Sequence, residues 1–248
     1  MNFPDHFSKL ARQYARYRPR YPDDLYAFLS AVVHGHELAW DCGTGSGQAA
    51  VGLANYFDIV IATDASEDQI AHAAPHPKVE YRQEKSENVS LPDASCDLVT
   101  VAVAVHWFDL PLFYQEVWRV LKPGGVLAVW GYSELQITPE IDKIILEYQY
   151  EVLDGYWPDG IHYLFEKYRT LPFPFQELPH PEFNMTTHWN LDELTGFLAS
   201  WSAAQKYMEA KGHHPLEQIW SALSAAWGDE EQKKEFHWPL HTRIGRKM

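Results

Sequence analysis

The sequence predicts an α/β fold: a mostly parallel sheet with helices on both faces. Two observations carry this prediction. From about residue 35 to residue 132, short apolar runs alternate with helical patterns, which is typical of buried parallel strands connected by helices. A glycine-rich loop, Gly43-Thr44-Gly45-Ser46-Gly47, directly follows the first of these runs, at the place where βαβ units bind ligands.

The individual elements follow from periodicity and from helix-breaking residues. A first amphipathic helix is expected over residues 5–18, and a second begins at Asp23 and Asp24, whose carboxylates suit a helix amino terminus. The Lys122-Pro123-Gly124-Gly125 turn ends the last helix before the final central strand. The expected strands are 38–42, 59–63, 79–83, 98–105 and 126–130, and the helices between them are 47–56, 67–74 and 111–121.

Beyond residue 132 the composition shifts toward Tyr, Trp, Phe and Pro. We interpret this region as an insertion within one domain. The predicted parts are a helical lid (1–34), a cofactor-binding core (35–132), a substrate-side insertion (133–180) and carboxy-terminal strands and helices (181–248). Within them we expect a helix at 139–153, strands at 182–189 and 235–244, and helices at 191–207 and 216–227.

Composition and charge exclude several classes of protein. Lys plus Arg number 20 and Asp plus Glu 34, and the net charge of −14 disfavours a nucleic-acid partner. The two cysteines, Cys42 and Cys96, fall in predicted strands, so a disulfide framework is not expected and a cytoplasmic location fits. The most apolar stretch, residues 98–105, is too short to span a bilayer, and the start lacks the pattern of a signal peptide.

Two carboxylates define the ligand expected at the glycine loop. Asp64 follows the second predicted strand, about twenty residues past the glycines, where a carboxylate can bind both ribose hydroxyls. Asp41 precedes the loop, and its negative charge opposes a pyrophosphate but favours an ammonium group. S-adenosylmethionine satisfies both demands, because it joins a ribose to a methionine amino group and has no phosphate. The alternatives are that Asp64 is a helix N-cap and that Asp41 is a buried acid satisfied within the protein.

The residues at this point resemble those of a known family. Residues 40–47 (WDCGTGSG) resemble motif I of class I S-adenosylmethionine-dependent methyltransferases, with Asp64 at the acidic position. Residues 14–22 (YARYRPRYP), 104–109 (AVHWFD) and 198–203 (LASWSA) are similar to small-molecule methyltransferases of the trans-aconitate type (methyltransferase type 11). The resemblance covers nearly the whole chain except roughly residues 138–180.

The resemblance implies a Rossmann-like sheet of seven strands, the last antiparallel, and a set of cofactor contacts. Asp41, Gly43 and Gly45 would hold the methionine end and Asp64 the ribose, while Ser86 and Glu87 would flank the adenine. Lys85 stands where many relatives have an acidic residue, and an amine cannot accept a hydrogen bond from the adenine amino group. Backbone groups near Ser86 are therefore expected to bind the adenine. Val103 stands where relatives often carry Gln. The full set expected at the cofactor is Asp41, Gly43, Gly45, Asp64, Ala65, Ser86, Glu87 and Ala104.

The expected acceptor side lies after the fourth strand. His106, Trp107 and Asp109 fall at the ligand edge of the sheet, and His106 is the candidate general base, or else it only packs there. A cluster of Tyr14, Tyr17, Arg18 and Tyr21 forms either a lid that grips a carboxylate or an ordinary docked helix. The aromatic residues of the insertion either close the acceptor pocket or form a satellite core; they are Tyr148, Tyr150, Tyr156, Trp157, Tyr163, Phe165 and Tyr168.

These features favour methyl transfer to a small molecule and leave the acceptor open; the family resemblance implies a carboxylate oxygen of a small organic acid. Two alternatives remain open: a nicotinamide-dependent oxidoreductase, motivated by the glycine loop alone, and a binding module that retains the cofactor but no activity. Gln48 counts against the oxidoreductase, because it occupies the place of the third glycine of the dinucleotide motif. The His pairs at 34/36 and 213/214 lack further ligands, so no metal is expected.

Overall fold

The computed structural model describes residues 19–248. The predicted helix at 5–18, and with it Tyr14, Tyr17 and Arg18, lies outside the described residues. Internal contacts divide the chain into two compact units. We call them the sheet unit (Arg20–Ser133, Gly160–Asn184 and Pro239–Met248) and the helical unit, whose described residues are Pro19, Glu134–Asp159 and Met185–Trp238.

The sheet has eight strands in the order β3-β2-β1-β4-β5-β8-β6, and β7 pairs with β8. Strands β1 to β5 are parallel, whereas β8 runs antiparallel to β5 and to β6. The expected fold class and the antiparallel last strand are therefore confirmed. The strands are β1 (Leu38–Cys42), β2 (Ile59–Asp64), β3 (Val79–Gln83), β4 (Cys96–Ala102), β5 (Leu121–Gly131), β6 (Gln176–Glu177), β7 (Phe183–Trp189) and β8 (Lys234–Arg246).

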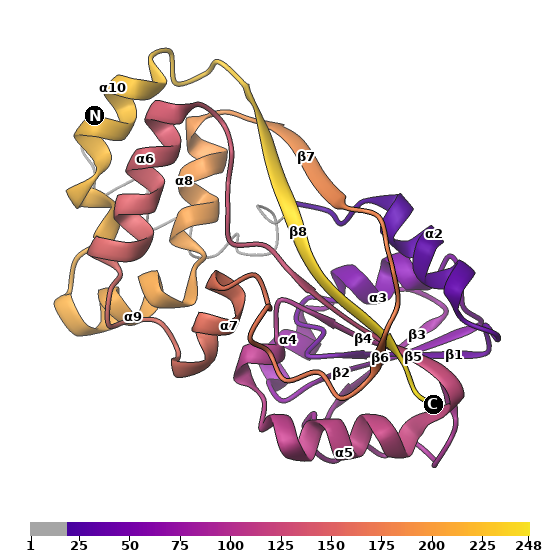
Figure 1. The fold of residues 1–248 in the computed structure, drawn as a ribbon. Coiled ribbons are helices and arrows are strands. Elements are labelled where there is room, and N and C mark those ends of the chain that lie inside the picture. The colour runs from indigo at the N-terminus through magenta and orange to yellow at the C-terminus, as the bar shows by residue number, and fades with distance from the viewer. Residues whose placement is uncertain (1–18) are drawn as a thin grey trace. The chain divides into compact units, whose positions relative to one another are not determined.

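Helices cover both faces of the central strands (Figure 1). Helices α2 and α3 lie on one face, and α5 lies on the other. The burial of α5 follows from its sequence: Leu110, Phe113, Tyr114, Val117 and Val120 recur at helical spacing and are buried. The helical elements of the sheet unit are α2 (Asp23–Val32), α3 (Gln48–Leu53), α4 (Glu67–Ala71), η2 (Val105–Trp107), α5 (Leu110–Val120) and α7 (His162–Phe165), and η4 (Asp159–Ile161) spans the boundary.

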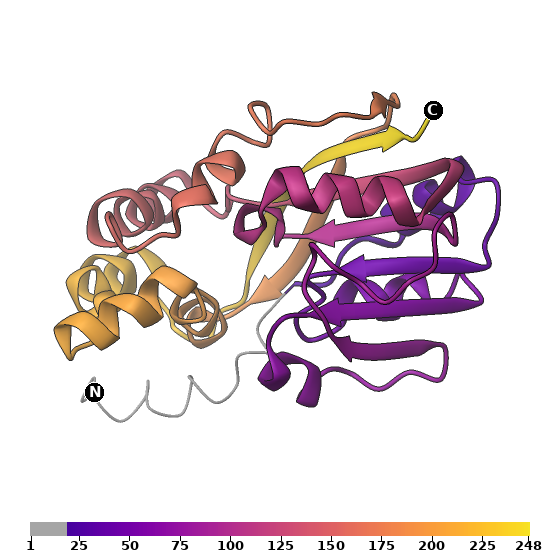
Figure 2. The same ribbon diagram turned by 90° about the horizontal axis from the view of Figure 1, so that it is seen from below.

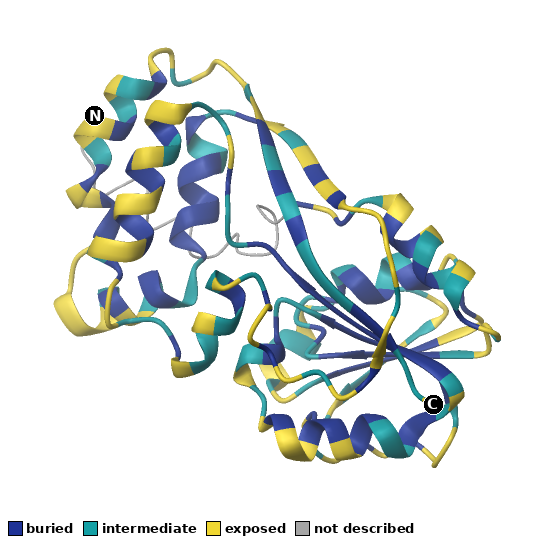
Figure 3. Ribbon diagram, viewed as in Figure 1, coloured by how far each residue is buried: buried dark blue, intermediate teal, exposed yellow. Residues whose placement is uncertain are grey.

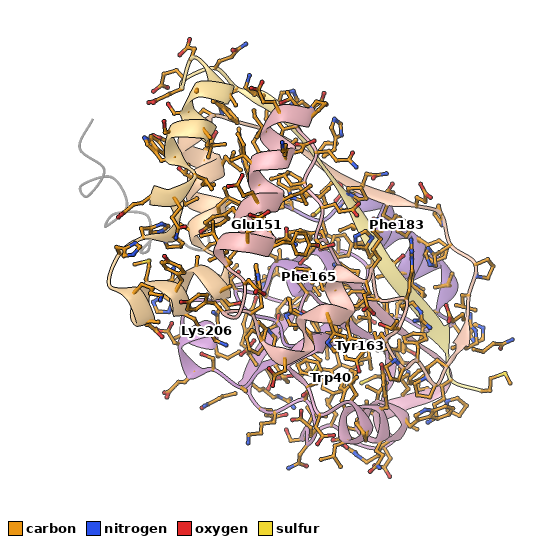
Figure 4. The ribbon with its side chains drawn as sticks, turned by 60° about the vertical axis from the view of Figure 1, so that its left-hand side comes forward. Trp40, Glu151, Tyr163, Phe165, Phe183 and Lys206 are labelled. Atoms are coloured by element: carbon orange, nitrogen blue, oxygen red, sulfur yellow. The ribbon has the colours of Figure 1, made fainter. Side chains whose placement is uncertain are left out.

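The core of the sheet unit lies between α5 and the strands. Trp40, Val99 and Val129 are wholly buried there, and Tyr163 packs against the same cluster. Figure 3 shows the buried strands and the alternation of buried and exposed residues along α5. Figure 4 labels Trp40 and Tyr163 among the side chains of this unit. Burial on both faces explains why β4 reads as one continuous apolar run in the sequence.

The helical unit is built mainly from helices packed side by side (Figure 2). Its core is aromatic: Tyr148 and Trp157 contact Trp201, with ring centroids 5.8 and 5.6 Å apart, and Tyr156 contacts Tyr207 at 4.9 Å. These contacts support the satellite-core interpretation for this part of the predicted insertion. The elements are α6 (Pro139–Glu147), the π-helical turn η3 (Tyr148–Val152), α8 (Leu191–Ala199), α9 (Ser202–Lys211), η5 (Pro215–Gln218) and α10 (Trp220–Trp227).

The structure differs from the expected elements in several places. Strand β5 begins at Leu121, so the expected turn at residues 122–125 belongs to the strand, and the expected helix 139–153 is α6 followed by the π-helical turn η3. The eighth strand, β6, has only two residues, which is too short to leave a periodic pattern. The predicted helix 191–207 is two helices, because Trp201 is extended and the Ser200 hydroxyl bonds the Phe197 carbonyl. The predicted helix 216–227 is likewise divided into η5 and α10. The predicted strand 98–105 ends at Ala102, because Val103 has φ +54.

Arg119 fixes the segment that leads into β4. Its guanidinium forms two hydrogen bonds with the carboxylate of buried Glu116, at 2.9 and 2.6 Å, and it also donates to the Val89 and Leu91 carbonyls. Because all of these bonds are made by one planar group, Arg119→Met should lower the free energy of unfolding by about 2–3 kcal/mol. Urea denaturation followed by circular dichroism measures this.

Arg82→Met is the matched control. Arg82 pairs with the exposed carboxylate of Glu80 at 2.9 Å, and a pair of this kind contributes about 1 kcal/mol or less. Equal effects of the two substitutions would contradict the structural role given to Arg119.

Candidate functional site

The candidate site lies where the strand order of the sheet reverses. Strands β2 and β3 extend from one side of β1, whereas β4 and β5 extend from the other side, so the reversal falls between β1 and β4. Loops that leave neighbouring strands at such a point diverge and open a crevice at the carboxyl ends of the strands. The glycine loop after β1 and the turn after β4 are the two loops at this point.

The glycine loop needs its glycines for conformation and for space. Gly43, Gly45 and Gly47 all have positive φ, at +67, +54 and +84. A Cβ on Gly43 would lie 2.7 Å from the Ala104 Cβ, so the turn after β4 packs directly on this loop. Of the atoms in the described part of the chain, a Cβ on Gly45 would meet only the Gln69 Oε1, at 3.8 Å. The loop is therefore tightly packed at Gly43 and open above Gly45, where a ligand can approach the backbone.

Asp41 is wholly buried at the end of β1. Its two carboxylate oxygens accept hydrogen bonds from the hydroxyls of Thr44, at 2.6 Å, and Thr100, at 2.7 Å. Burial raises the pKa of Asp41 to about 6, although both hydroxyls favour the charged form. The structure thus shows a buried acid satisfied within the protein, which joins the glycine loop to β4.

Asp64 ends β2 and connects two loops. Its Oδ2 accepts from the Gly45 amide and its Oδ1 from the Ser66 amide, both at 2.9 Å. The N-cap of α4 is Ser66, whose hydroxyl accepts from the Gln69 amide, so the interpretation of Asp64 as this N-cap is wrong. A carboxylate has about four lone-pair positions, and two backbone bonds leave capacity for ligand hydroxyls.

The residues expected near an adenine lie after β2 and β3. Ala65 is exposed and its carbonyl accepts from the Gln83 side chain at 3.3 Å. Ser86 is buried, whereas Glu87 is partly exposed and its Oε1 accepts from the Asp109 amide at 3.1 Å. The bond between Glu87 and Asp109 brings the loop before β4 to the start of α5.

The turn after β4 carries the candidate acceptor-side residues. Val103 has φ +54, an uncommon and strained conformation for a β-branched residue, and its amide bonds the Trp130 carbonyl of β5 at 2.8 Å. His106 and Trp107 form η2, with their rings 5.5 Å apart, and Trp107 is 53% exposed. Asp109 has another role, because its carboxylate caps α5.

Tyr21 also lies at this edge of the sheet. It is buried, and its ring contacts Trp130, near the end of β5, edge to face at 5.4 Å. The other three members of the predicted lid lie outside the described residues. The aromatic insertion is divided, since Tyr163, Phe165 and Tyr168 belong to the sheet unit and Tyr148, Tyr150, Tyr156 and Trp157 to the helical unit.

The residues present fit a nucleoside ligand that has no phosphate. The open backbone above Gly45 admits a ligand, while the carboxylate of Asp64 beside it and the buried carboxyl group of Asp41 disfavour a pyrophosphate at this loop. Within residues 19–248, no group of three or more His, Cys, Asp or Glu side chains is arranged to hold a metal ion. Across the same residues, no helix has the length and apolarity needed to cross a membrane.

Comparisons with known proteins identify the family. The family model described as "Methyltransferase domain" matches residues 40–129. A Dictyostelium discoideum protein named "Putative methyltransferase" is 34% identical over 229 residues, which cover 91% of this chain and 87% of that protein. The chain belongs to the class I S-adenosylmethionine-dependent methyltransferases. It is an enzyme of this family, and its cofactor is S-adenosylmethionine.

Two further comparisons agree with this assignment. A solved structure titled a putative type II methyltransferase, from Anaeromyxobacter dehalogenans, is 41% identical with a TM-score of 0.84, covering 93% of this chain and 98% of that chain. A Mycolicibacterium smegmatis protein named "Probable S-adenosylmethionine-dependent methyltransferase" is 36% identical over 104 residues, or 41% of this chain and 40% of that protein. The oxidoreductase alternative is therefore discarded.

The sequence interpretation missed two residues of the candidate site and the conformation of a third. Thr44 and Thr100 hold the Asp41 carboxylate, and Thr100 could have been noticed as a polar residue within an otherwise apolar strand. The strained backbone of Val103 leaves no signal in the sequence, since valine is an ordinary strand residue.

Proposed function

We propose that this methyltransferase transfers a methyl group to a small molecule and that the atom methylated is a carboxylate oxygen. The observation that carries this proposal is the composition of the acceptor edge. Residues 103–108 (VAVHWF) after β4 and 130–133 (WGYS) at the end of β5 include no acidic residue. Asp109 and Glu134 directly follow these two segments, and the Asp109 carboxylate is engaged in capping α5. The segments themselves carry no charge that would repel an anionic acceptor, and their aromatic residues suit a partly apolar one.

The cofactor would be held by residues at the place where the strand order reverses, between β1 and β4. Gly43 and Gly45 would cradle the methionine end, with the charge of Asp41 beneath them, and Asp64 would accept from the ribose hydroxyls. Ser86 and Glu87, with Ala65 and Ala104, would line the adenosine. When bound, the cofactor supplies a methyl group on a positively charged sulfur, which is electrophilic without help from the protein.

The protein's own contribution to the reaction is then alignment and exclusion of water. A carboxylate has a reference pKa near 4, so it is already charged at neutral pH and needs no base. His106 would become a general base only for an acceptor that must lose a proton, such as a phenol. This makes the pH dependence of the reaction diagnostic of the acceptor.

A methyl-transfer screen tests the acceptor class. Matched acids, phenols and amines, such as benzoate, phenol and benzylamine, are incubated with the protein and S-adenosylmethionine, and release of S-adenosylhomocysteine is measured. We expect turnover with carboxylic acids, at a rate that stays flat between pH 6.5 and 8. Turnover confined to phenols or amines, with a rate that rises with pH, would overturn the proposal.

The raised pKa of Asp41 predicts a pH-dependent affinity. The folded protein without ligand holds this proton up to about pH 6, whereas a bound ammonium favours the charged carboxylate. Binding below pH 6 must therefore release the proton, so the affinity for S-adenosylhomocysteine should fall by up to about tenfold per pH unit below 6 and stay flat above 7. Calorimetric titrations from pH 5 to 7.5 measure this.

Asp41→Asn is the control for this pH dependence. It removes the titrating group but keeps a side chain of the same shape, so the affinity of the variant should be lower and flat across the same range. An affinity of the wild-type protein that does not change between pH 5 and 7 would contradict the placement of an ammonium near Asp41.

We also propose roles for the remaining parts of the chain. Residues 35–132 would form the cofactor-binding core, residues 1–34 a lid, and residues 133–180 a substrate-side insertion, of which residues 160–180 belong to the sheet unit. A location in the cytoplasm is supported by Cys42 and Cys96, which are both buried free thiols.

A further inference from the structure

The hydroxyl of Tyr168 is a buried polar group without a hydrogen-bond partner among residues 19–248. Tyr168 is wholly buried, and its Oη makes no hydrogen bond to any described residue. Burial raises the pKa of this hydroxyl well above its ordinary value, so it stays protonated and can donate. Buried hydroxyls nearly always have a partner in a working protein, and one without a partner calls for an explanation such as a ligand.

This hydroxyl lies at the carboxyl end of β5. A Cβ on Gly131, the last residue of that strand, would be 2.6 Å from the Tyr168 Oη, so the glycine makes room for the hydroxyl. The pairing of Ala102 with Trp130 places Gly131 beside Val103, at the turn whose next residue, Ala104, packs on Gly43. Two strand spacings, about 10 Å, therefore separate the glycine loop from the end of β5.

The segment that carries Tyr168 is held in an unusual conformation. Lys167 and Tyr168 both have positive φ, +59 and +58, which is uncommon for single residues other than glycine and rarer for two in succession. Arg243 on β8 donates to the carbonyls of Tyr168 and Leu171, at 2.8 and 3.2 Å, and its guanidinium is paired with Glu177. Strain that surrounding bonds maintain is typical of functional positions.

The same segment covers the turn after β4. A Cβ on Gly160 would lie 2.2 Å from the His106 carbonyl oxygen, so the chain at Gly160 rests directly on η2. Residues 160–168 thus pack on the end of β5 at Tyr168 and on η2 at Gly160, and all of these residues belong to the sheet unit. These are the two strand ends at which the proposed function places the methyl acceptor.

We propose that Tyr168 is an acceptor-binding residue whose hydroxyl donates a hydrogen bond to an oxygen of the methyl acceptor. The inference rests on the proposed function and deepens it. A carboxylate offers two oxygens, so one can accept from Tyr168 while the other reacts. That second oxygen forms the new bond to the methyl carbon, the carbon–sulfur bond breaks with its electron pair left on sulfur, and no proton is exchanged.

Three tyrosine-to-phenylalanine substitutions test this proposal. Tyr168→Phe removes the hydroxyl in question. Tyr148→Phe removes another buried hydroxyl that has no partner among residues 19–248, from the core of the helical unit. Tyr114→Phe removes a buried hydroxyl that does have a partner, the Pro172 carbonyl. Each variant is measured for melting temperature, for affinity for S-adenosylhomocysteine, and for KM with the best substrate of the screen of acids, phenols and amines.

The proposal expects a distinct pattern for Tyr168→Phe. Its melting temperature should be equal to or above that of the wild type, and its affinity for S-adenosylhomocysteine should be unchanged. Its KM for the acceptor should rise about 10- to 100-fold, because one buried hydrogen bond to the acceptor is lost. Tyr148→Phe should likewise keep the melting temperature at or above that of the wild type and leave the affinity for S-adenosylhomocysteine unchanged, but its acceptor KM should not rise. Tyr114→Phe should lower the melting temperature and leave KM unchanged.

An unchanged KM in Tyr168→Phe would overturn the role of Tyr168, and so would a fall in melting temperature like that of Tyr114→Phe. If the best substrate is an amine or phenol, the proposed acceptor class fails, yet the KM of that substrate still decides the role of Tyr168. If the screen yields no substrate, thermal shifts by benzoate, phenylacetate and citrate with S-adenosylhomocysteine present decide it. Equal shifts, or none, in wild type and Tyr168→Phe overturn the proposal.

Discussion

Replacing Asp64 with alanine should weaken the binding of S-adenosylhomocysteine about 5- to 150-fold, or ~1–3 kcal/mol. The loss has two sources in the structure. The proposed bonds to the ribose hydroxyls disappear, and the amides of Gly45 and Ser66 lose the carboxylate that holds both loops in place. Calorimetric titration measures the change, and circular dichroism checks that the variant is folded.

Asp68→Ala is the matched control for Asp64→Ala. Asp68 lies in the first turn of α4, its side chain is 87% exposed, and its charge is the same. Its removal should change the affinity less than twofold, because only the general electrostatic field is altered and salt screens that field. An equal loss in both variants would assign the effect to net charge rather than to a contact with the ribose.

Gly43→Ala should destabilise the protein by about 2–4 kcal/mol and lower the affinity for S-adenosylhomocysteine more than tenfold. Gly43 has φ +67, which disfavours any side chain, and the added Cβ would lie 2.7 Å from the Ala104 Cβ and 3.0 Å from the Phe108 ring. The turn after β4 must then move away from the glycine loop, so the two loops that form the proposed cofactor site are no longer held in contact. Urea denaturation and calorimetry measure the two effects.

Gly212→Ala separates strain from crowding. Gly212 has φ +76, close to that of Gly43, but a Cβ there would meet no atom of residues 19–248 within 4 Å. This variant should lose only the conformational part, about 1 kcal/mol, and keep full affinity. If Gly43→Ala proves no worse than Gly212→Ala in either measurement, the close contact between the two loops is not what shapes the site.

The central part of the fold could be predicted because its signals are local and strong. Strands β1 and β3 begin and end at the predicted residues. Strand β1 is a mostly buried run that ends just before the glycine loop, whereas β3 is only partly buried and alternates apolar with polar residues at Val79, Glu80, Tyr81 and Arg82. The placement of Asp41, Gly43 and Asp64 at strand ends follows from the same pattern. What these residues touch could not be predicted, because their partners Thr100 and Ala104 lie about sixty residues away in the chain.

The region beyond residue 132 was harder to predict for a physical reason. Aromatic residues indicate burial but not the compact unit in which they are buried. Tyr148 and Tyr168 have similar sequence surroundings, yet they belong to different compact units. The break at Trp201 depends on one side chain bonding its own helix. The positive φ of Tyr168 is imposed by tertiary bonds such as that from Arg243 and has no local signature.

The central claim is that the Asp64 carboxylate accepts hydrogen bonds from the ribose hydroxyls of the cofactor at this loop. Its most direct test combines a change in the protein with a change in the ligand. S-adenosylhomocysteine and its 2′-deoxyribose analogue are titrated by calorimetry into the wild type and into Asp64→Ala. The account predicts that the wild type binds the deoxy analogue at least fivefold more weakly, and that Asp64→Ala binds the two ligands equally. The same loss for the deoxy analogue in both proteins would contradict it.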